Sequence, residues 1–221
     1  PDDTEMATAK TGTWFIDNPQ RGRSNNSALL LRGETSKEQF AELMKSVKEF
    51  GEPGFVWSDS TELLVNPCVE IGMWPVCEKT KESGWQACNL STINCAKIKT
   101  EQDFFDACRA ATIIGTLQAG FSEFEYLGGA SERIISREAL LGVSMTGIME
   151  QHDICLDPTA QKRGATIVKK TNKNIADMIG INQAARTTCI KPEGTSSCIL
   201  GTSSGIHPHH AKRYIRRVQA N

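Results

Sequence analysis

Long helix-like segments alternate with short apolar runs along this chain, and this alternation constrains its fold more than any other feature. Helical periodicity and helix-end signals mark residues 36–50, residues 101–119 and the segment from Asp157 to Gly180. Short runs such as "ALLL", "FVW" and "ARTTCI" lie outside these segments. Strands that alternate with long helices are typical of βαβ units, whose neighbouring strands are parallel. The sequence therefore predicts an α/β fold with a largely parallel sheet.

Each of the three helical segments begins with a capping signal. A hydroxyl or carboxylate before the first turn accepts a backbone N–H, and a glycine after the last turn allows a left-handed end. The run "ALLGVSMTGIM" is apolar throughout, so its periodicity is compatible with a buried strand or a buried helix. The signals are Ser36 with Gln39, Thr100 with Asp103, Asp157 with Pro158, and the glycines Gly51 and Gly180.

The composition is that of an ordinary globular chain. The 221 residues are 39% hydrophobic and 23% charged, enough for one large domain or two small ones. The formal net charge of −1 provides no basic surface for nucleic acid or anionic membrane. No apolar run approaches the roughly 18 residues that a membrane span needs. The chain begins at Pro1 and ends on "YIRRVQAN", so we expect it to be a piece of a longer protein.

Eight cysteines could indicate a secreted disulfide framework, but their irregular spacing argues against one. Without a signal segment, we expect a cytoplasmic protein with mostly free thiols. No C-x-x-C pair occurs and no spacing matches a common zinc site, so we predict no metal.

The stretch "LLVNPCVEIGMWP", residues 63–75, is the first candidate site. Pro67 and the β-branched neighbours of Cys68 favour an extended chain, in which side chains two residues apart point the same way. Asn66, Cys68 and Glu70 are then predicted to share one face. Because proline interrupts an ordinary central strand, we expect a loop or finger.

The carboxylate of Glu70 makes Cys68 a poor thiolate nucleophile, since a nearby negative charge raises the pKa of a thiol. A cysteine kept as a thiol for hydrogen-atom chemistry fits better, with Glu70 as a base and Asn66 as a hydrogen-bonding positioner. The alternative interpretation is a half-buried loop cysteine without a catalytic role.

The stretch "KPEGTSS", residues 191–197, is the second candidate site. A loop that leads into a helix start presents N–H groups and hydroxyls to an anion. It is not a Walker A loop, and Ser/Thr-rich turns that only cap helices are a simpler alternative. Glu193 would repel a phosphate unless it binds another donor, such as a sugar hydroxyl or a backbone N–H.

Four motifs occur in an order that resembles the catalytic subunit of ribonucleotide reductases. They are "NPCVEI", "ACNLSTIN", "RTTCIKPEGTSS" and "SSGIHPHHAKRYIRRV". The sequence is most similar to the adenosylcobalamin-dependent class II enzymes of the monomeric type, from about residue 10 to the end. The resemblance implies that residues 1–221 are about half of a ten-stranded α/β barrel with a central finger loop.

The resemblance also implies an activity. It is the reduction of ribonucleotides, as triphosphates or alternatively as diphosphates, to 2′-deoxyribonucleotides for DNA synthesis, by thiyl-radical chemistry that adenosylcobalamin starts. The implied partners are the ribonucleotide and a thioredoxin-like or dithiol reductant.

Matching positions carry the implied roles. Cys68 becomes the thiyl radical that abstracts the 3′-hydrogen, Glu70 takes the 3′-hydroxyl proton, and Asn66 binds the substrate hydroxyls. Cys88 is one of two redox cysteines that end as a disulfide. The substrate phosphate site is Glu193, Gly194, Thr195, Ser196 and Ser197, with Glu193 at the ribose end.

The sequence also departs from the family. The second redox cysteine, which lies upstream of the finger loop in relatives, is absent, and a long insert adds Cys77. We prefer Cys88 as the redox cysteine because the "CNL" context matches. We expect the isolated chain to be inactive. The alternatives are a class I subunit, whose radical comes from a partner protein, and a non-catalytic, thiol-rich phosphate-binding module.

Overall fold

The computed structural model describes residues 3–215 and 217, so most of the closing "IRRVQAN" stretch lies outside the described residues. The chain divides into two compact units, Pro1–Trp74 and Pro75–Asn221.

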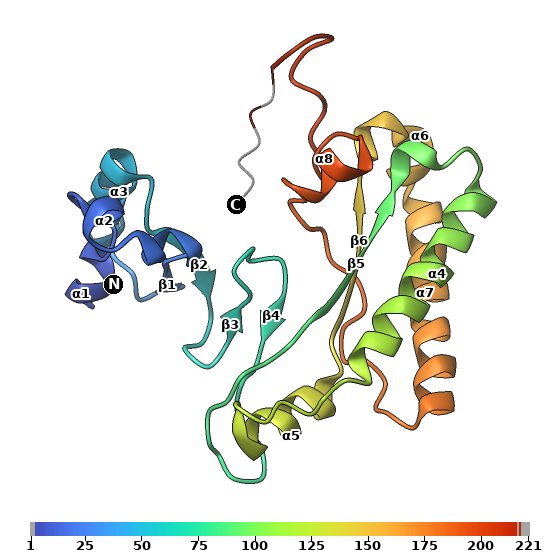
Figure 1. The fold of residues 1–221 in the computed structure, drawn as a ribbon, viewed down its shortest axis with the longest axis horizontal. Helices are drawn as coiled ribbons and strands as arrows, with labels where there is room; N and C mark the ends of the chain where they lie inside the picture. The colour runs from blue at the N-terminus through green and yellow to red at the C-terminus, as the bar shows by residue number, and fades with distance from the viewer. Residues whose placement is uncertain (1–2, 216, 218–221) are drawn as a thin grey trace. The chain divides into compact units, whose positions relative to one another are not determined.

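The first unit is built around one parallel βαβ element and a small hairpin (Figure 1). Strands β1 and β2 pair in parallel from Ser27↔Gly54 to Leu31↔Ser58, and α3 connects them. The capping box of Ser36 with Gln39 is present, which confirms the predicted start of this helix. The elements are α1 (Thr4–Thr8), α2 (Trp14–Asp17), η1 (Pro19–Arg23), β1 (Ser27–Leu31), α3 (Lys37–Phe50), β2 (Gly54–Ser58), β3 (Leu64–Val65) and β4 (Gly72–Met73).

Aromatic packing and one buried ion pair hold the first unit together. The ring of Phe40 on α3 lies 5.2 Å from that of Phe55 and 5.7 Å from that of Trp57, both on β2. Lys10 is 7% exposed, and its Nζ lies 2.7 Å from Oε1 of Glu52. A buried charge needs such a partner, so this pair fixes the N-terminal segment to the turn before β2.

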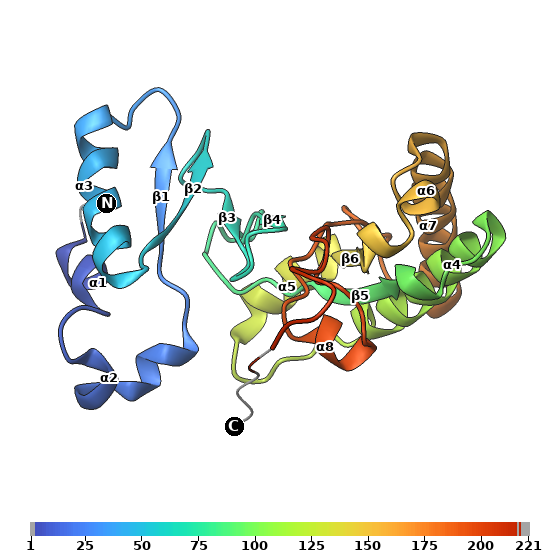
Figure 2. The same ribbon diagram turned by 90° about the horizontal axis from the view of Figure 1, so that it is seen from above.

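The second unit is a parallel pair of strands with two long helices packed side by side (Figures 1 and 2). Strands β5 and β6 pair in register from Asn89↔Leu141 to Asn94↔Thr146. Helices α4 and α5 lie in the connection between these strands, and α7 follows β6. The elements are β5 (Asn89–Asn94), η2 (Cys95–Lys97), α4 (Glu101–Ala119), α5 (Gly128–Glu138), β6 (Leu141–Thr146), η3 (Ile148–Glu150), α6 (His152–Cys155), α7 (Pro158–Ile179) and α8 (Ser196–Leu200).

The main core of the second unit lies between the strands and the two long helices. Ile93 and Val143 from the strands pack with Phe104 and Val168 from the helices. Gly164 lets α7 approach α4 closely, since a Cβ there would lie 2.8 Å from the Phe104 ring. The two strands therefore form one layer, and the two long helices pack on it as a second layer.

The structure confirms the predicted α/β class and the three long helices, and it shows that "LGVSMT" is a strand. The described strands form three two-stranded sheets, so the ten-stranded barrel stays a prediction. Helix α5 was not predicted, because it begins with two glycines and no capping side chain. In the described part of the chain, no helix is both long and apolar enough to cross a membrane.

Candidate functional site

The "NPCVEI" motif forms the turn of the β3–β4 hairpin rather than a continuous strand. Asn66 closes this turn: its Oδ1 accepts the N–H of Ile71 at 3.0 Å, and its carbonyl accepts the N–H of Val69 at 2.9 Å. Val69 has a φ of 65°, in the left-handed region. The predicted extended chain is therefore wrong, because the asparagine side chain and the left-handed residue reverse the chain direction.

Without an extended chain, strand alternation no longer places Asn66, Cys68 and Glu70 on one face. Cys68 is exposed at the turn. Glu70 is half-buried, and neither of its two carboxylate oxygens is exposed or has a hydrogen-bond partner within the described residues. A buried carboxylate without a donor is costly in a folded protein. The carboxylate of Glu70 is thus a strong acceptor, and no donor among the residues that the structure describes binds it.

The "KPEGTSS" loop of the second unit is organised around the side chain of Glu193. This residue is 3% exposed and has a φ of 55°. Its carboxylate accepts the hydroxyl of Thr92 on β5 and the hydroxyl of Ser196 at the start of α8. The structure thus supplies hydroxyl donors for the acidic residue that the sequence left without a partner, and it ties the loop to the strand.

The hydroxyls expected to bind phosphate differ in their surroundings. Thr195 is exposed, whereas Ser197 is fully buried and its hydroxyl lies 3.3 Å from the carbonyl of Gly194. The hydroxyl of Ser196 is engaged by Glu193. The loop does lead into a helix start, as predicted, because α8 begins at Ser196.

The C-terminal ends of β5 and β6 hold the rest of this segment. Asn94 Nδ2 donates to the carbonyl of Leu200 at 3.1 Å, and Thr146 Oγ1 donates to the carbonyl of Ser203 at 2.9 Å. Gly205 has a φ of 53°, and a Cβ there would lie 2.9 Å from the Lys191 carbonyl oxygen. Only glycine fits this close approach, so the chain folds back against its own loop.

Glu150 anchors the segment that follows α8. Its Oε1 accepts the hydroxyl of Thr202 at 2.7 Å and the N–H of Ser203 at 2.6 Å, and it lies 3.0 Å from Nε2 of His209. Burial alone would raise the pKa of Glu150, but these hydrogen bonds and the nearby imidazole outweigh burial and lower it. Nδ1 of His209 lies 2.9 Å from the hydroxyl of Tyr214. Sequence reasoning missed Thr92 and Glu150, because only distant contacts reveal their roles.

Cys88 lies just before β5, at the end of the strand opposite the loop. Thr92 lies four positions further along the chain, or roughly 13 Å at the usual rise of a strand. The structure therefore does not bring Cys88 next to Glu193. Asn66, Cys68 and Glu70 belong to the hairpin of the first unit, whereas Cys88 and the loop belong to the second.

The insert cysteine Cys77 has a different environment from the predicted site cysteines. It is buried, and Nε of Arg133 donates to its sulfur at 3.2 Å. Hydrogen bonds from Thr80 and then from Arg133 lower its pKa to about 6. A thiolate at neutral pH is therefore favoured at Cys77. No group of His, Cys, Asp or Glu side chains in the described residues is arranged to hold a metal ion.

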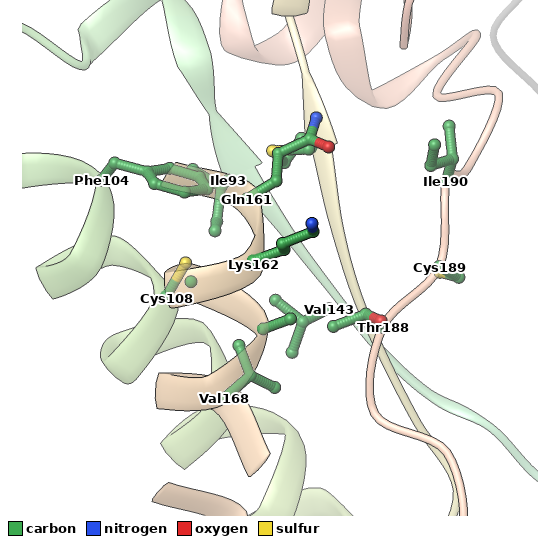
Figure 3. A pocket seen from close by; sticks show the side chains of 13 residues that line it. Ile93, Phe104, Cys108, Val143, Gln161, Lys162, Val168, Thr188, Cys189 and Ile190 are labelled. Carbon is green, nitrogen blue, oxygen red and sulfur yellow. The ribbon is translucent and has the colours of Figure 1, made fainter. Parts of the chain in front are cut away.

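A cavity of about 440 Å³ lies elsewhere, between α7 and residues 188–190 (Figure 3). Its walls are mostly apolar, and Gln161 and Lys162 extend from α7 toward it. None of the predicted site residues lines this cavity.

Comparison with known proteins finds relatives that share one name, adenosylcobalamin-dependent ribonucleoside-triphosphate reductase. No protein-family model matches the chain. A probable adenosylcobalamin-dependent ribonucleoside-triphosphate reductase of Dictyostelium discoideum is 24% identical over 225 residues, covering 91% of this chain and 28% of that protein. The corresponding reductase of Lactobacillus helveticus is 24% identical, covering 90% and 31%. That of Euglena gracilis is 25% identical, covering 89% and 27%.

A solved structure supports the same relationship at the level of the fold. The crystal structure of a B12-dependent, class II ribonucleotide reductase superimposes with a TM-score of 0.65 at 21% identity, over 95% of this chain and 33% of that one. The chain thus spans about a third of the length of the relatives it matches. These matches confirm the predicted resemblance to the class II reductases.

Proposed function

We propose that this chain is part of the catalytic domain of a class II ribonucleotide reductase, which reduces ribonucleoside triphosphates to 2′-deoxyribonucleotides. The relatives and the shared fold support the family. The buried and unpaired carboxylate of Glu70, two residues from an exposed cysteine, carries the chemical part of the proposal.

Cys68 and Glu70 have separate roles at the ribose: Cys68 removes a hydrogen atom and Glu70 removes a proton. Adenosylcobalamin, when bound, would supply the radical chemistry, and Cys68 would give up its thiol hydrogen to that radical and become a thiyl. The exposed position of Cys68 fits a sulfur that a radical carrier must reach. An S–H bond then forms at Cys68 as the C3′–H bond of the ribose breaks. Glu70 takes the proton of the 3′-hydroxyl, which gives its carboxylate the missing donor.

Asn66 has a second task beside substrate binding. Its Oδ1 is occupied by the N–H of Ile71, so the amide N–H₂ is the group left to bind a substrate hydroxyl. The same side chain shapes the turn that presents Cys68. We therefore assign Asn66 both a positioning role and a binding role.

The loop of residues 191–197 binds the substrate phosphates through Gly194, Thr195 and Ser196, whereas the buried Ser197, expected there too, bonds to Glu193 and Gly194 and holds the turn. Glu193 is turned into the protein in this structure, so we assign it the positioning of the loop in place of the expected ribose contact. The hydroxyl of Ser196 binds Glu193, and the backbone N–H of Ser197 donates to the carbonyl of Glu193. The backbone N–H groups of Gly194, Thr195 and Ser196 and the exposed Thr195 hydroxyl therefore remain for the anion.

Cys88 is one of two cysteines that deliver the reducing equivalents and end as a disulfide, which a thioredoxin-like or small dithiol reductant reopens. Its partner cysteine is expected upstream in the longer protein. We expect the 221 residues alone to be inactive for this reason.

The test is a Cys68→Ser change in the full-length enzyme, assayed for deoxyribonucleotide formation with adenosylcobalamin and a dithiol. We expect turnover to fall below detection, because serine does not form a comparable radical. A Cys108→Ala variant is the control, since Cys108 lies on α4, outside all four motifs, and it should keep its activity. Undiminished turnover in Cys68→Ser would refute the radical role.

The same assay separates the alternatives. Turnover that needs a partner protein instead of adenosylcobalamin would assign a class I reductase. Triphosphate binding without any turnover by the wild-type full-length protein would assign a non-catalytic binding module.

A further inference from the structure

Two cysteines that the proposed mechanism does not use meet inside the second unit. Cys95 begins η2, directly after β5, and Cys155 ends α6, in the segment after β6. Both are 0% exposed, and both belong to one small buried cluster with Ile148. The side chain of Met145 packs against this cluster. Segments far apart in the sequence thus bring two thiols into one apolar site.

The two thiols share this apolar site and are close enough to affect each other's ionisation. This contact raises the pKa of Cys95 and lowers the pKa of Cys155, because the thiol of Cys95 stabilises the ionised sulfur of Cys155. Cys108 also lies nearby, but burial and then the charge of Cys155 raise its pKa to about 11. Of these three cysteines, Cys155 is therefore the one that ionises first, and Cys95 is its neighbour.

We infer that Cys95 and Cys155 form a reversible intramolecular disulfide when the protein meets a two-electron oxidant such as a peroxide. The thiolate of Cys155 attacks the peroxide, so an S–O bond forms and the O–O bond breaks. The departing hydroxide takes up the proton that the Cys155 thiol released on ionising, which gives one water. The sulfur of Cys95 then displaces the hydroxyl, forming the S–S bond and releasing the second water. The two thiols lose two electrons, and the peroxide is reduced to two waters. A dithiol restores both thiols by exchange.

Burial sets the rate of this reaction without preventing it. Peroxide is little larger than water, and α6 is a helix of only four residues. Short elements of this kind open locally at a fraction of the free energy of global unfolding. We therefore expect slow oxidation of the folded protein, at a rate limited by the opening of α6.

The disulfide would join the turns that follow β5 and β6. Asn94, which holds the carbonyl of Leu200, directly precedes Cys95. Glu150, which holds Thr202 and Ser203, lies in the turn between β6 and α6. Oxidation thus cross-links the edge of the unit that supports the 191–205 segment. The inference stands on the cysteine pair alone and does not depend on the proposed enzymatic function.

The test maps the oxidised cysteines in the full-length protein. The reduced, folded protein is treated with hydrogen peroxide, denatured in the presence of N-ethylmaleimide, digested and examined by mass spectrometry. We expect a peptide linked through Cys95 and Cys155 that disappears after dithiothreitol. The oxidised wild-type protein should unfold about 5–10 °C higher than the reduced one, because the cross-link restricts the unfolded chain.

Variants provide the matched control. Cys95→Ala and Cys155→Ala should each abolish the cross-link and the shift in unfolding temperature, whereas Cys108→Ala should keep both. The mapping experiment on the wild-type protein stays decisive even where a variant fails to fold. A wild-type protein in which Cys95 and Cys155 are both alkylated after full peroxide treatment would overturn the inference. A cross-link between Cys108 and Cys155 would overturn it as well.

Discussion

Thr92 on β5 donates its hydroxyl to the buried carboxylate of Glu193, which lies 101 residues further along the chain. This contact joins the strand of the "ACNLSTIN" motif to the loop of the "KPEGTSS" motif. Because Glu193 is 3% exposed and has a left-handed backbone, the loop conformation depends on donors from outside the loop. Two motifs that resemble one family in sequence are thus physically coupled.

Removing the Thr92 hydroxyl should weaken this coupling. We expect Thr92→Val to lower the free energy of unfolding by about 1–3 kcal/mol, because a buried carboxylate loses a donor while the side-chain volume is kept. Urea unfolding measures this change. Thr92→Ser keeps the hydroxyl and should lose less stability than Thr92→Val. Equal losses in the two variants would show that the contact contributes nothing.

The lowered pKa of Glu150 predicts an acid-dependent loss of stability. A carboxyl whose pKa is lower in the folded than in the unfolded state stabilises the fold above its ordinary value of 4.5. This contribution is lost as the pH falls through the lower pKa of the folded state. We expect wild type and Glu150→Gln to differ most near pH 7 and to converge as the pH falls below 4.5. Stability measured by urea unfolding at several pH values checks this, and a constant difference would contradict it.

The unpaired carboxylate of Glu70 predicts opposite effects on stability and activity. Glu70→Met replaces a buried group without a donor by an apolar side chain of similar length, so we expect unfolding to cost about 1 kcal/mol more. Turnover of the full-length enzyme should fall at least about 100-fold, because the general base that we propose is gone. Glu62→Met, at an exposed position before β3, is the control and should change neither quantity. A Glu70→Met enzyme that keeps its turnover would remove Glu70 from the mechanism.

The left-handed backbone at Val69 predicts a gain from glycine. A β-branched residue at a φ of 65° is strained by roughly 1–2 kcal/mol, and the side chain is 41% exposed. We expect Val69→Gly to stabilise the protein by up to about 1 kcal/mol, after the entropy cost of glycine. Val65→Gly, in strand β3, should be destabilising. Thermal unfolding of both variants measures these changes. A destabilised Val69→Gly would mean that packing of the valine side chain outweighs its backbone strain.

The parts of the fold that could be predicted are those with local signals. The capping boxes at Ser36 and Thr100 depend only on residues three positions apart, so the sequence is enough to place these helix starts. Helix α5 has no capping side chain and begins with glycines, which on their own indicate a turn. Its position follows from packing, as Ile134 is fully buried.

The sequence predicts which residues belong to the candidate site but not how they are arranged in space. The motif order pointed to Cys68, Glu70 and Glu193, but β propensity wrongly gave an extended chain around Cys68. The side chain of Asn66 competes with strand pairing there, and propensity does not include that bond. The partner of Glu193 could not be predicted, because nothing near it in the sequence identifies Thr92.

The separation of 101 positions between Thr92 and Glu193 also determines when this region becomes ordered during folding. Contacts between residues so distant in sequence form only after the intervening chain has been ordered, because closing a long loop costs entropy before any contact repays it. During synthesis, β5, α4, β6 and α7 all leave the ribosome before Glu193 does. A truncated or stalled chain would therefore have its strands and long helices but lack the organised loop. The anion binding that we propose for this loop would then report that the unit has folded up to and including the loop.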